Sequence, residues 1–259
     1  MMSAVRIAVT VAGLLALWQA LVWFSDLPPY ILPPPSLVLT RLASDLALVA
    51  RHAGITLIEI VLGLSLGTAL GASAALAISA TPALRRWLFP VLVIAPSIPF
   101  FALAPLLVLW LGYGLASKVA MAAIIIFFPV TAAFLDGLRR TDPSWLRLAR
   151  VMTDGSSKPR ADWAELRHVR LPAALPALGS GLRVAAAVAP IGAVVGEWVG
   201  SSAGLGYLML HANGRMQIDL LFAALLTLSV IGVTLFFVVD RGLRAAMPWQ
   251  ADSLPEERT

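Results

Sequence analysis

Four ionisable side chains stand inside or at the ends of apolar stretches of this sequence: Glu59, Arg183, Glu197 and Asp219. Because an unpaired charge at membrane depth costs about 3 kcal/mol, such a residue pairs with another group, faces water, or lines the path of a solute. For Glu197 and Asp219 the alternative explanation is solvation at the membrane surface. For Arg183 it is an internal ion pair, or a side chain that extends to the cytoplasmic surface. Glu59 is harder to explain in this way, since it lies about two helical turns inside its stretch.

The side chains that catalysis requires are missing. The chain has no cysteine, and His52, His168 and His211 are too far apart to form an H-E-x-x-H metal site. There is no G-x-S-x-G, and neither Lys118 nor Lys158 belongs to a phosphate-binding P-loop. We therefore expect no enzyme, no metal and no cofactor bound by this chain, so that active work must draw energy from a partner or an ion gradient.

The composition is that of a membrane protein. Hydrophobic residues make up 59% of the 259 residues and charged residues only 13%, with a mean hydropathy of +0.88. A soluble domain has too little interior to bury so much apolar surface, and a membrane span needs about 20 mostly apolar residues. The sequence predicts an all-α membrane protein with six transmembrane helices, at residues 5–24, 53–79, 87–111, 117–136, 174–198 and 219–239.

Basic residues set the predicted orientation. With the N- and C-termini both cytoplasmic, fourteen Lys and Arg residues fall in cytoplasmic segments and four, Lys118 among them, in external ones. This bias follows the positive-inside rule, and it explains the net charge of +5 better than nucleic-acid binding does. We expect one multi-pass domain over residues 1–259 in the cell inner membrane, with its first apolar run retained as an anchor rather than cleaved.

Two predicted spans carry distinctive residues. Small residues recur every four positions in the second span, so that one helix face lets another backbone approach closely, within this chain or in a second copy. The third span has four prolines, which remove backbone donors and kink a helix that either lines a pathway or simply bends. The residues concerned are Gly63, Gly67, Gly71 and Ala75, and Pro90, Pro96, Pro99 and Pro105. Pro96 and Pro99 are our pathway candidates.

Before the second span, Ser36 is predicted to cap an amphipathic helix over residues 36–50.

A long charged segment separates the fourth and fifth spans. Eight of the nineteen basic residues fall within residues 139–170. TDPSWLRLARVM predicts a helix with Thr141 or Asp142 as N-cap, DGSSKP breaks the pattern, and RADWAELRHVR forms a second helical piece. Two short helices joined by a turn, within residues 137–173 on the cytoplasmic side, predict a docking element for a partner. The alternative is an ordinary positive-inside loop, which needs only two or three charges.

This segment resembles the EAA loop of ABC-transporter inner-membrane permeases, whose pattern is E-A-A-x3-G-x9-I-x-L-P. One E-A-A residue is retained, and fifteen residues stand where the pattern has nine, which an insertion around DGSSKP explains. Gly155 is then the displaced glycine. The resemblance implies that the ATPase-coupling residues are Arg147, Leu148 and Ala149 at E-A-A, Met152, Thr153 at the glycine position, Gly155, and Val169, Leu171 and Pro172 at I-x-L-P.

The likeness extends over nearly the whole chain. LPPYILPPPSLVL, the proline-rich third span, LPAALPALGSGLRVAAA and GEWVGSSAGLGYLM are similar to permeases of the nitrate/sulfonate/taurine type, and the last stretch, through HANGRMQIDLLFAALL, looks closest to hydroxymethylpyrimidine and thiamine-precursor permeases. The resemblance implies a type I ABC importer permease fold that works by alternating access. It also implies a separate ATPase subunit that binds ATP and Mg, a periplasmic or lipid-anchored substrate-binding protein, and a second permease copy in a homodimer or a heterodimer.

The substrate is predicted from few residues. A neutral or weakly basic heteroaromatic suits Glu197, Trp198 and Asn213 near the outer mouth, through hydrogen bonds and stacking. A sulfonate, taurine or nitrate would need a positive pathway, and Arg183 is the only basic residue well inside a span. The sequence therefore favours a hydroxymethylpyrimidine-type compound, with sulfonate, taurine or nitrate as the alternative. An ion-coupled secondary transporter that uses Glu59 or Glu197 is a further alternative, although no convincing internal repeat supports it.

Overall fold

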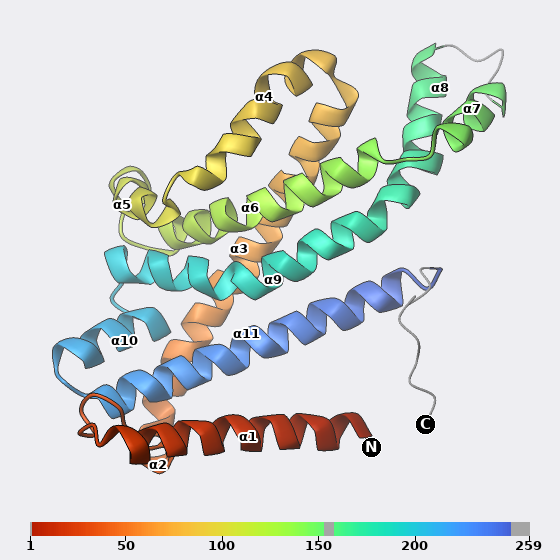
Figure 1. The fold of residues 1–259 in the computed structure, drawn as a ribbon. Helices are drawn as coiled ribbons and strands as arrows, with labels where there is room; N and C mark the ends of the chain where they lie inside the picture. Colours follow the sequence, from red (N-terminus) through yellow and green to blue (C-terminus); the bar gives the residue numbers. More distant parts are fainter. Residues whose placement is uncertain (1, 153–157, 250–259) are drawn as a thin grey trace.

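The structure is a computed structural model that describes residues 2–152 and 158–249 (Figure 1). Every regular element in these residues is a helix, and no strand occurs among them. The long helices are α1 (Met2–Ser25), α3 (Leu46–Ala80), α6 (Leu115–Arg139), α9 (Leu171–Gly200) and α11 (Ile218–Ala246). The shorter elements are α2 (Pro35–Ser44), α4 (Pro82–Ile94), η1 (Ala95–Ser97), η2 (Phe100–Leu103), α5 (Ala104–Leu111), α7 (Pro143–Met152), α8 (Lys158–Glu165), the π-helical turn η3 (Leu166–Arg170) and α10 (Leu205–Gly214).

Five helices are long and apolar enough to cross a membrane, and they contain five of the six predicted spans. The third predicted span is different, because α4 and α5 qualify only as a pair that is bent by 99°. Its prolines explain the break. Ile98 is extended, with φ −81° and ψ 124°, since a residue before proline avoids the α conformation. Pro96 and Pro99 also supply no backbone donor to continue the helix.

The interior forms where α3, α6 and α9 pack together, and the small residues of α3 allow this packing. All four predicted small residues, Gly63 to Ala75, are buried. A Cβ added to Gly67 would lie 2.8 Å from the carbonyl oxygen of Ala123 and 2.8 Å from Ile126 of α6. Of the two roles expected for this face, the structure therefore shows packing within the chain. The cluster at its centre comprises Ile60, Ala122, Ile126, Val130, Ala185, Ala189 and Ala193.

α1 and α11 lie side by side (Figure 1), and both expose apolar side chains. Trp18 stacks on Phe222 with the ring centroids 5.6 Å apart, whereas Trp23 and Phe24 are 76% and 90% exposed, as suits contact with lipid. In Figure 1 the start of α1, the end of α11 and α7 share one side, at the right, and α2, α5 and α10 lie at the left. This grouping agrees with the prediction that both termini share a side with the charged segment. That this side is the cytoplasm stays a prediction.

The amphipathic helix before the second span is shorter than predicted. Its N-cap is Pro34 rather than Ser36, because Pro35 takes the first helical position, where a missing N–H costs little. The helix ends before Asp45, and α3 begins immediately after that residue. The last five residues of the predicted range 36–50 therefore belong to α3.

Candidate functional site

The first helix of the charged segment starts where it is predicted to start. Asp142 is its N-cap, since Oδ1 accepts hydrogen bonds from the backbone N–H and from the hydroxyl of Ser144, both at 2.7 Å. Two hydrogen bonds lower the pKa of Asp142 below its usual range, because both favour the ionised carboxyl. The larger effect comes from the Ser144 hydroxyl and the smaller from the Ser144 backbone N–H. Of the two predicted N-caps, Asp142 is therefore the correct one.

The second helix of this segment is not a separate short helix. α8 continues through η3 into α9, in an apolar helical run from Asp162 to Gly200. Pro172 does not interrupt this run, because it stands at the start of α9. α7 therefore lies beside an extension of the fifth span rather than beside a second free helix.

Glu165 joins the two arms of this hairpin. It is 9% exposed, and its Oε1 accepts a hydrogen bond from Arg170 Nη2 at 2.6 Å while Oε2 lies 3.4 Å from Arg150 Nε. The Arg150 side chain is 69% exposed, so solvent screens that pair more strongly than the pair with Arg170. The carboxylate thus links α7 to the run from α8 to α9 through the weaker of its two ion pairs.

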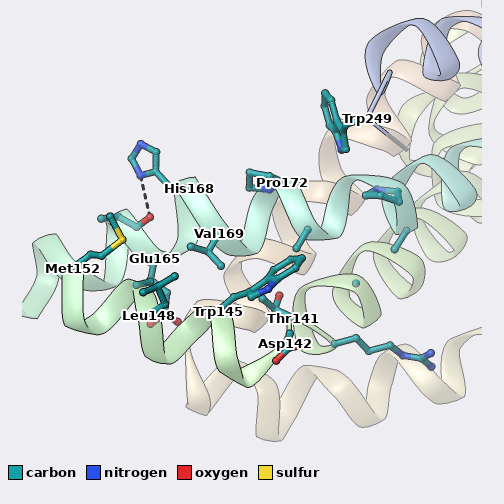
Figure 2. Close-up of a pocket in the computed structure, with 17 residues that line it drawn as sticks. Thr141, Asp142, Trp145, Leu148, Met152, Glu165, His168, Val169, Pro172 and Trp249 are labelled. Carbon is teal, nitrogen blue, oxygen red and sulfur yellow. Dashed lines mark hydrogen bonds between the residues drawn. The ribbon is translucent and has the colours of Figure 1, made fainter. Parts of the chain in front are cut away.

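A groove of about 1030 Å³ lies between α7 and the run from α8 to α9, with Trp249 at one end (Figure 2). Five of the predicted coupling residues line it: Leu148, Ala149, Met152, Val169 and Pro172. Apolar side chains in it are open to the surroundings, since Trp145, Leu148 and Met152 are 55%, 60% and 78% exposed. In a segment too charged to enter lipid, such a surface is typical of a protein-docking site.

The other predicted coupling residues lie elsewhere. Arg147 is exposed on α7 and does not line the groove. Leu171 points into the helix bundle, where it packs against the buried cluster that includes Phe134 and Leu138. Thr153 and Gly155 lie outside the described residues.

Several groove residues were not predicted as site residues, among them Trp145, His168 and Trp249. Trp145 could have been found, because it precedes Leu148 by three residues and so shares its helical face. His168 lies next to the predicted Val169, and its Nδ1 lies 3.1 Å from the Ala164 carbonyl oxygen (Figure 2). Trp249 follows α11, and no local pattern connects it with the charged segment.

Ion pairs account for charges within the spans. Glu59 is 0% exposed and accepts a hydrogen bond from Lys118 Nζ at 2.8 Å. The prediction that Lys118 lies in an external segment is wrong, because this residue is 7% exposed and belongs to the first turn of α6. Arg183 donates to Asp240 at 2.6 Å, which is the internal ion pair expected as one explanation for it.

The residues predicted near the outer mouth do not converge on one space. Glu197 is 1% exposed and therefore is not solvated at the surface. It accepts hydrogen bonds from the Thr56 hydroxyl at 2.6 Å and from the Gly206 N–H at 2.5 Å. Trp198 is 50% exposed and Asn213 is also exposed. A role in substrate passage for these residues, and for the prolines at the α4–α5 break, stays a prediction.

The arrangement suits docking and movement rather than bond chemistry. Within residues 2–152 and 158–249, no three His, Cys, Asp or Glu side chains gather as a metal site. The apolar groove stands at one end of the fifth span, and the buried polar pairs stand between helices.

Comparison with known proteins gives relatives that match this chain over most of their length. The chain is 54% identical to a "Probable ABC transporter permease protein" of Haemophilus influenzae over 89% of this chain and 91% of that protein. It is 37% identical to the "Riboflavin transport system permease protein RibX" of Chloroflexus aurantiacus, over 96% of this chain and 91% of the relative. It is 34% identical to the "Formylaminopyrimidine transport permease protein ThiX" of Halalkalibacterium halodurans, over 86% and 87%.

The fold has a counterpart among solved structures. A crystal structure of an amino acid ABC transporter matches with a TM-score of 0.60 at 17% identity, over 82% of this chain and 98% of that one. Residues 60–249 match the family described as "Binding-protein-dependent transport system inner membrane component". This protein therefore belongs to that family and is a multi-pass inner-membrane permease of an ABC importer.

Proposed function

We propose that this permease imports a neutral or weakly basic heteroaromatic of the hydroxymethylpyrimidine type by alternating access. The observation that carries this proposal is the pairing of basic side chains inside the spans. Lys118 lies 2.8 Å from Glu59, and Arg183 lies 2.6 Å from Asp240. An anionic sulfonate needs positive charge that is not already neutralised, and these pairs offer little of it.

Two of the relatives support the same class of substrate, whereas others are named for taurine and aliphatic sulfonates. One relative is named for formylaminopyrimidine and another for riboflavin, and both compounds are heteroaromatic. The exposed Trp198 offers an indole for stacking, and the exposed Asn213 offers an amide that can donate and accept hydrogen bonds. These groups suit an aromatic ring with nitrogen atoms better than a small tetrahedral anion.

The groove is the proposed binding site for the ATPase subunit. It presents Leu148, Met152 and Val169 beside the ion pair of Glu165 and Arg170. The ATPase would bind ATP and Mg, and its closure would move α7 together with the fifth span. A substrate-binding protein would approach the opposite end, where α10 lies, and a second permease copy would complete the pathway.

Transport in reconstituted vesicles tests the substrate. The permease, its ATPase and its binding protein are placed in proteoliposomes, and uptake of labelled hydroxymethylpyrimidine, taurine and an aliphatic sulfonate is compared. We expect ATP-dependent uptake of the pyrimidine alone. ATP-dependent uptake of taurine or the sulfonate instead would establish the alternative substrate class, and uptake driven by an ion gradient without ATP would contradict the importer mechanism.

A pair of variants on α7 tests the docking groove. Leu148→Asp places a charge in the groove, whereas Val151→Asp places the same charge at a side chain that is 74% exposed but does not line the groove. Pull-down of the ATPase in detergent should fail with L148D and succeed with V151D, because only L148D places an unpaired charge in the apolar interface with the ATPase. Equal binding by both variants would place the ATPase on another surface.

A further inference from the structure

A buried cluster of charged groups joins three long helices, near the start of α6 and the end of α9. Glu59 of α3, Lys118 of α6 and Glu197 of α9 are 0%, 7% and 1% exposed. The cluster contains two carboxyl groups and one ammonium group. If both carboxyl groups were ionised, it would hold an uncompensated negative charge away from water, which is strongly unfavourable.

Glu197 has every feature of an ionised carboxylate. Its Oε1 accepts a hydrogen bond from the Thr56 hydroxyl at 2.6 Å, and its Oε2 accepts from the N–H groups of Gly206 and Tyr207 at 2.5 Å and 3.3 Å. Both N–H groups belong to the first turn of α10, whose dipole also favours a negative charge there. Each oxygen thus faces donors, and charge-assisted bonds of this kind stabilise the anion.

The whole N-terminus of α10 is held by side chains of α3 and α9. The Gly204 N–H donates to His52 Nδ1 at 2.9 Å, and the Leu205 N–H donates to Thr56 Oγ1 at 2.7 Å. A Cβ added to Gly206 would lie 2.9 Å from Glu197 Oε2, so the close approach of the carboxylate depends on this glycine. The acceptors are therefore built into the fold rather than placed by chance.

Glu59 is in a different position. Its Oε1 accepts a hydrogen bond from Lys118 Nζ at 2.8 Å, but its Oε2 is buried and has no donor partner among the described residues. Glu197 reaches the same face of α3, since its Oε1 accepts the hydrogen bond of Thr56, which stands three residues before Glu59. Two carboxylates cannot hydrogen-bond to each other, whereas a carboxyl that carries a proton can donate to a carboxylate.

We propose that Glu59 binds a proton on Oε2 and donates it in a hydrogen bond to Glu197. The ligand of this site is a proton, held between two carboxyl groups. The cluster is then neutral, because the charges of Lys118 and Glu197 cancel and Glu59 adds none. Protonated Glu59 connects α3 and α6 to the carboxylate that holds α10, so the four helices are joined by one uninterrupted set of hydrogen bonds.

Amide substitutions distinguish the two carboxyl groups. In Glu59→Gln the side-chain carbonyl still accepts from Lys118, and its NH2 still donates to Glu197, which reproduces the protonated acid. In Glu197→Gln an NH2 group must face either the Thr56 hydroxyl or the α10 N–H groups, and the anion is lost. With the assembled permease–ATPase complex in lipid nanodiscs, we expect E59Q to unfold at the temperature of the wild type and E197Q to shift the folding equilibrium by about tenfold or more.

Infrared spectroscopy of the same samples at neutral pH supplies an independent readout. The wild type should show the carbonyl stretch of a protonated carboxylic acid, E59Q should lack it, and the control Asp219→Asn should retain it, since the Asp219 side chain is partly exposed. If E59Q is the destabilised variant and E197Q is tolerated, the proton belongs to Glu197 and the assignment is wrong. If the wild type lacks the band, both acids are ionised and the proposal fails, whatever the stabilities.

Discussion

The contact between α3 and α6 predicts that one methyl group on Gly67 will destabilise the protein measurably. A Cβ at this position would lie 2.8 Å from both the Ala123 carbonyl oxygen and the side chain of Ile126. Real Cβ atoms avoid such distances, so the two helices must move apart by several tenths of an ångström along a tightly packed face. Overpacking of this kind costs about 1–3 kcal/mol.

Gly54 on the same helix supplies the matched control. A Cβ added there meets nothing within 4 Å. Both substitutions, Gly67→Ala and Gly54→Ala, gain the same helix propensity of about 0.5–1 kcal/mol. The difference between them therefore isolates the steric term.

Thermal unfolding in detergent measures this difference. Since 1 kcal/mol moves the midpoint of a domain of this size by about 2–4 °C, G67A should unfold about 2–12 °C below G54A. The comparison also separates helix packing from assembly, provided that both variants are measured as monomers. Equal midpoints for the two variants would refute the packing argument, because α3 and α6 would then not approach as closely as described.

Two further changes test the charged groups. Asp240→Ala removes the partner of Arg183, whose side chain is 27% exposed, and should destabilise the protein by about 1–3 kcal/mol. The double replacement of Arg183→Met with Asp240→Leu should recover most of that loss. If Asp240→Ala is as stable as the wild type, the ion pair contributes nothing to stability. Asp142→Asn keeps an N-cap but cannot titrate. Because the pKa of Asp142 is lowered by its bonds to Ser144, the cap is present above the ordinary aspartate pKa and is lost as the pH falls through the lower folded value. Amide hydrogen exchange in α7 should therefore accelerate on acidification in the wild type more than in D142N, and identical pH profiles would contradict this role.

Much of the architecture could be predicted from local patterns. The five continuous spans follow from apolar length, the packed face of α3 from the four-residue spacing at Gly63 and Gly67, and the start of α7 from Asp142. Each of these features depends on residues within one or two helical turns, so the sequence carries the information directly.

Features that depend on contacts distant in sequence were harder to predict. Lys118 could not be placed without knowing that its α6 lies against Glu59 of α3, and a basic residue near a span end otherwise suggests an external loop. Glu197 at the end of a span looked solvated for the same reason. The prolines predicted a kink in the third span, but not an angle of 99°, because the angle depends on how α4 and α5 pack on α6.

The continuous run from α8 to α9 makes the fifth span a mechanical lever. About 28 residues separate Val169 in the groove from Glu197, which corresponds to about 42 Å along a helix. A tilt of about 5° around the groove end would carry Glu197 sideways by about 4 Å, which is more than the length of a hydrogen bond. Moved as one body, the run would thus convert a small tilt at the groove into a displacement large enough to shift the start of α10.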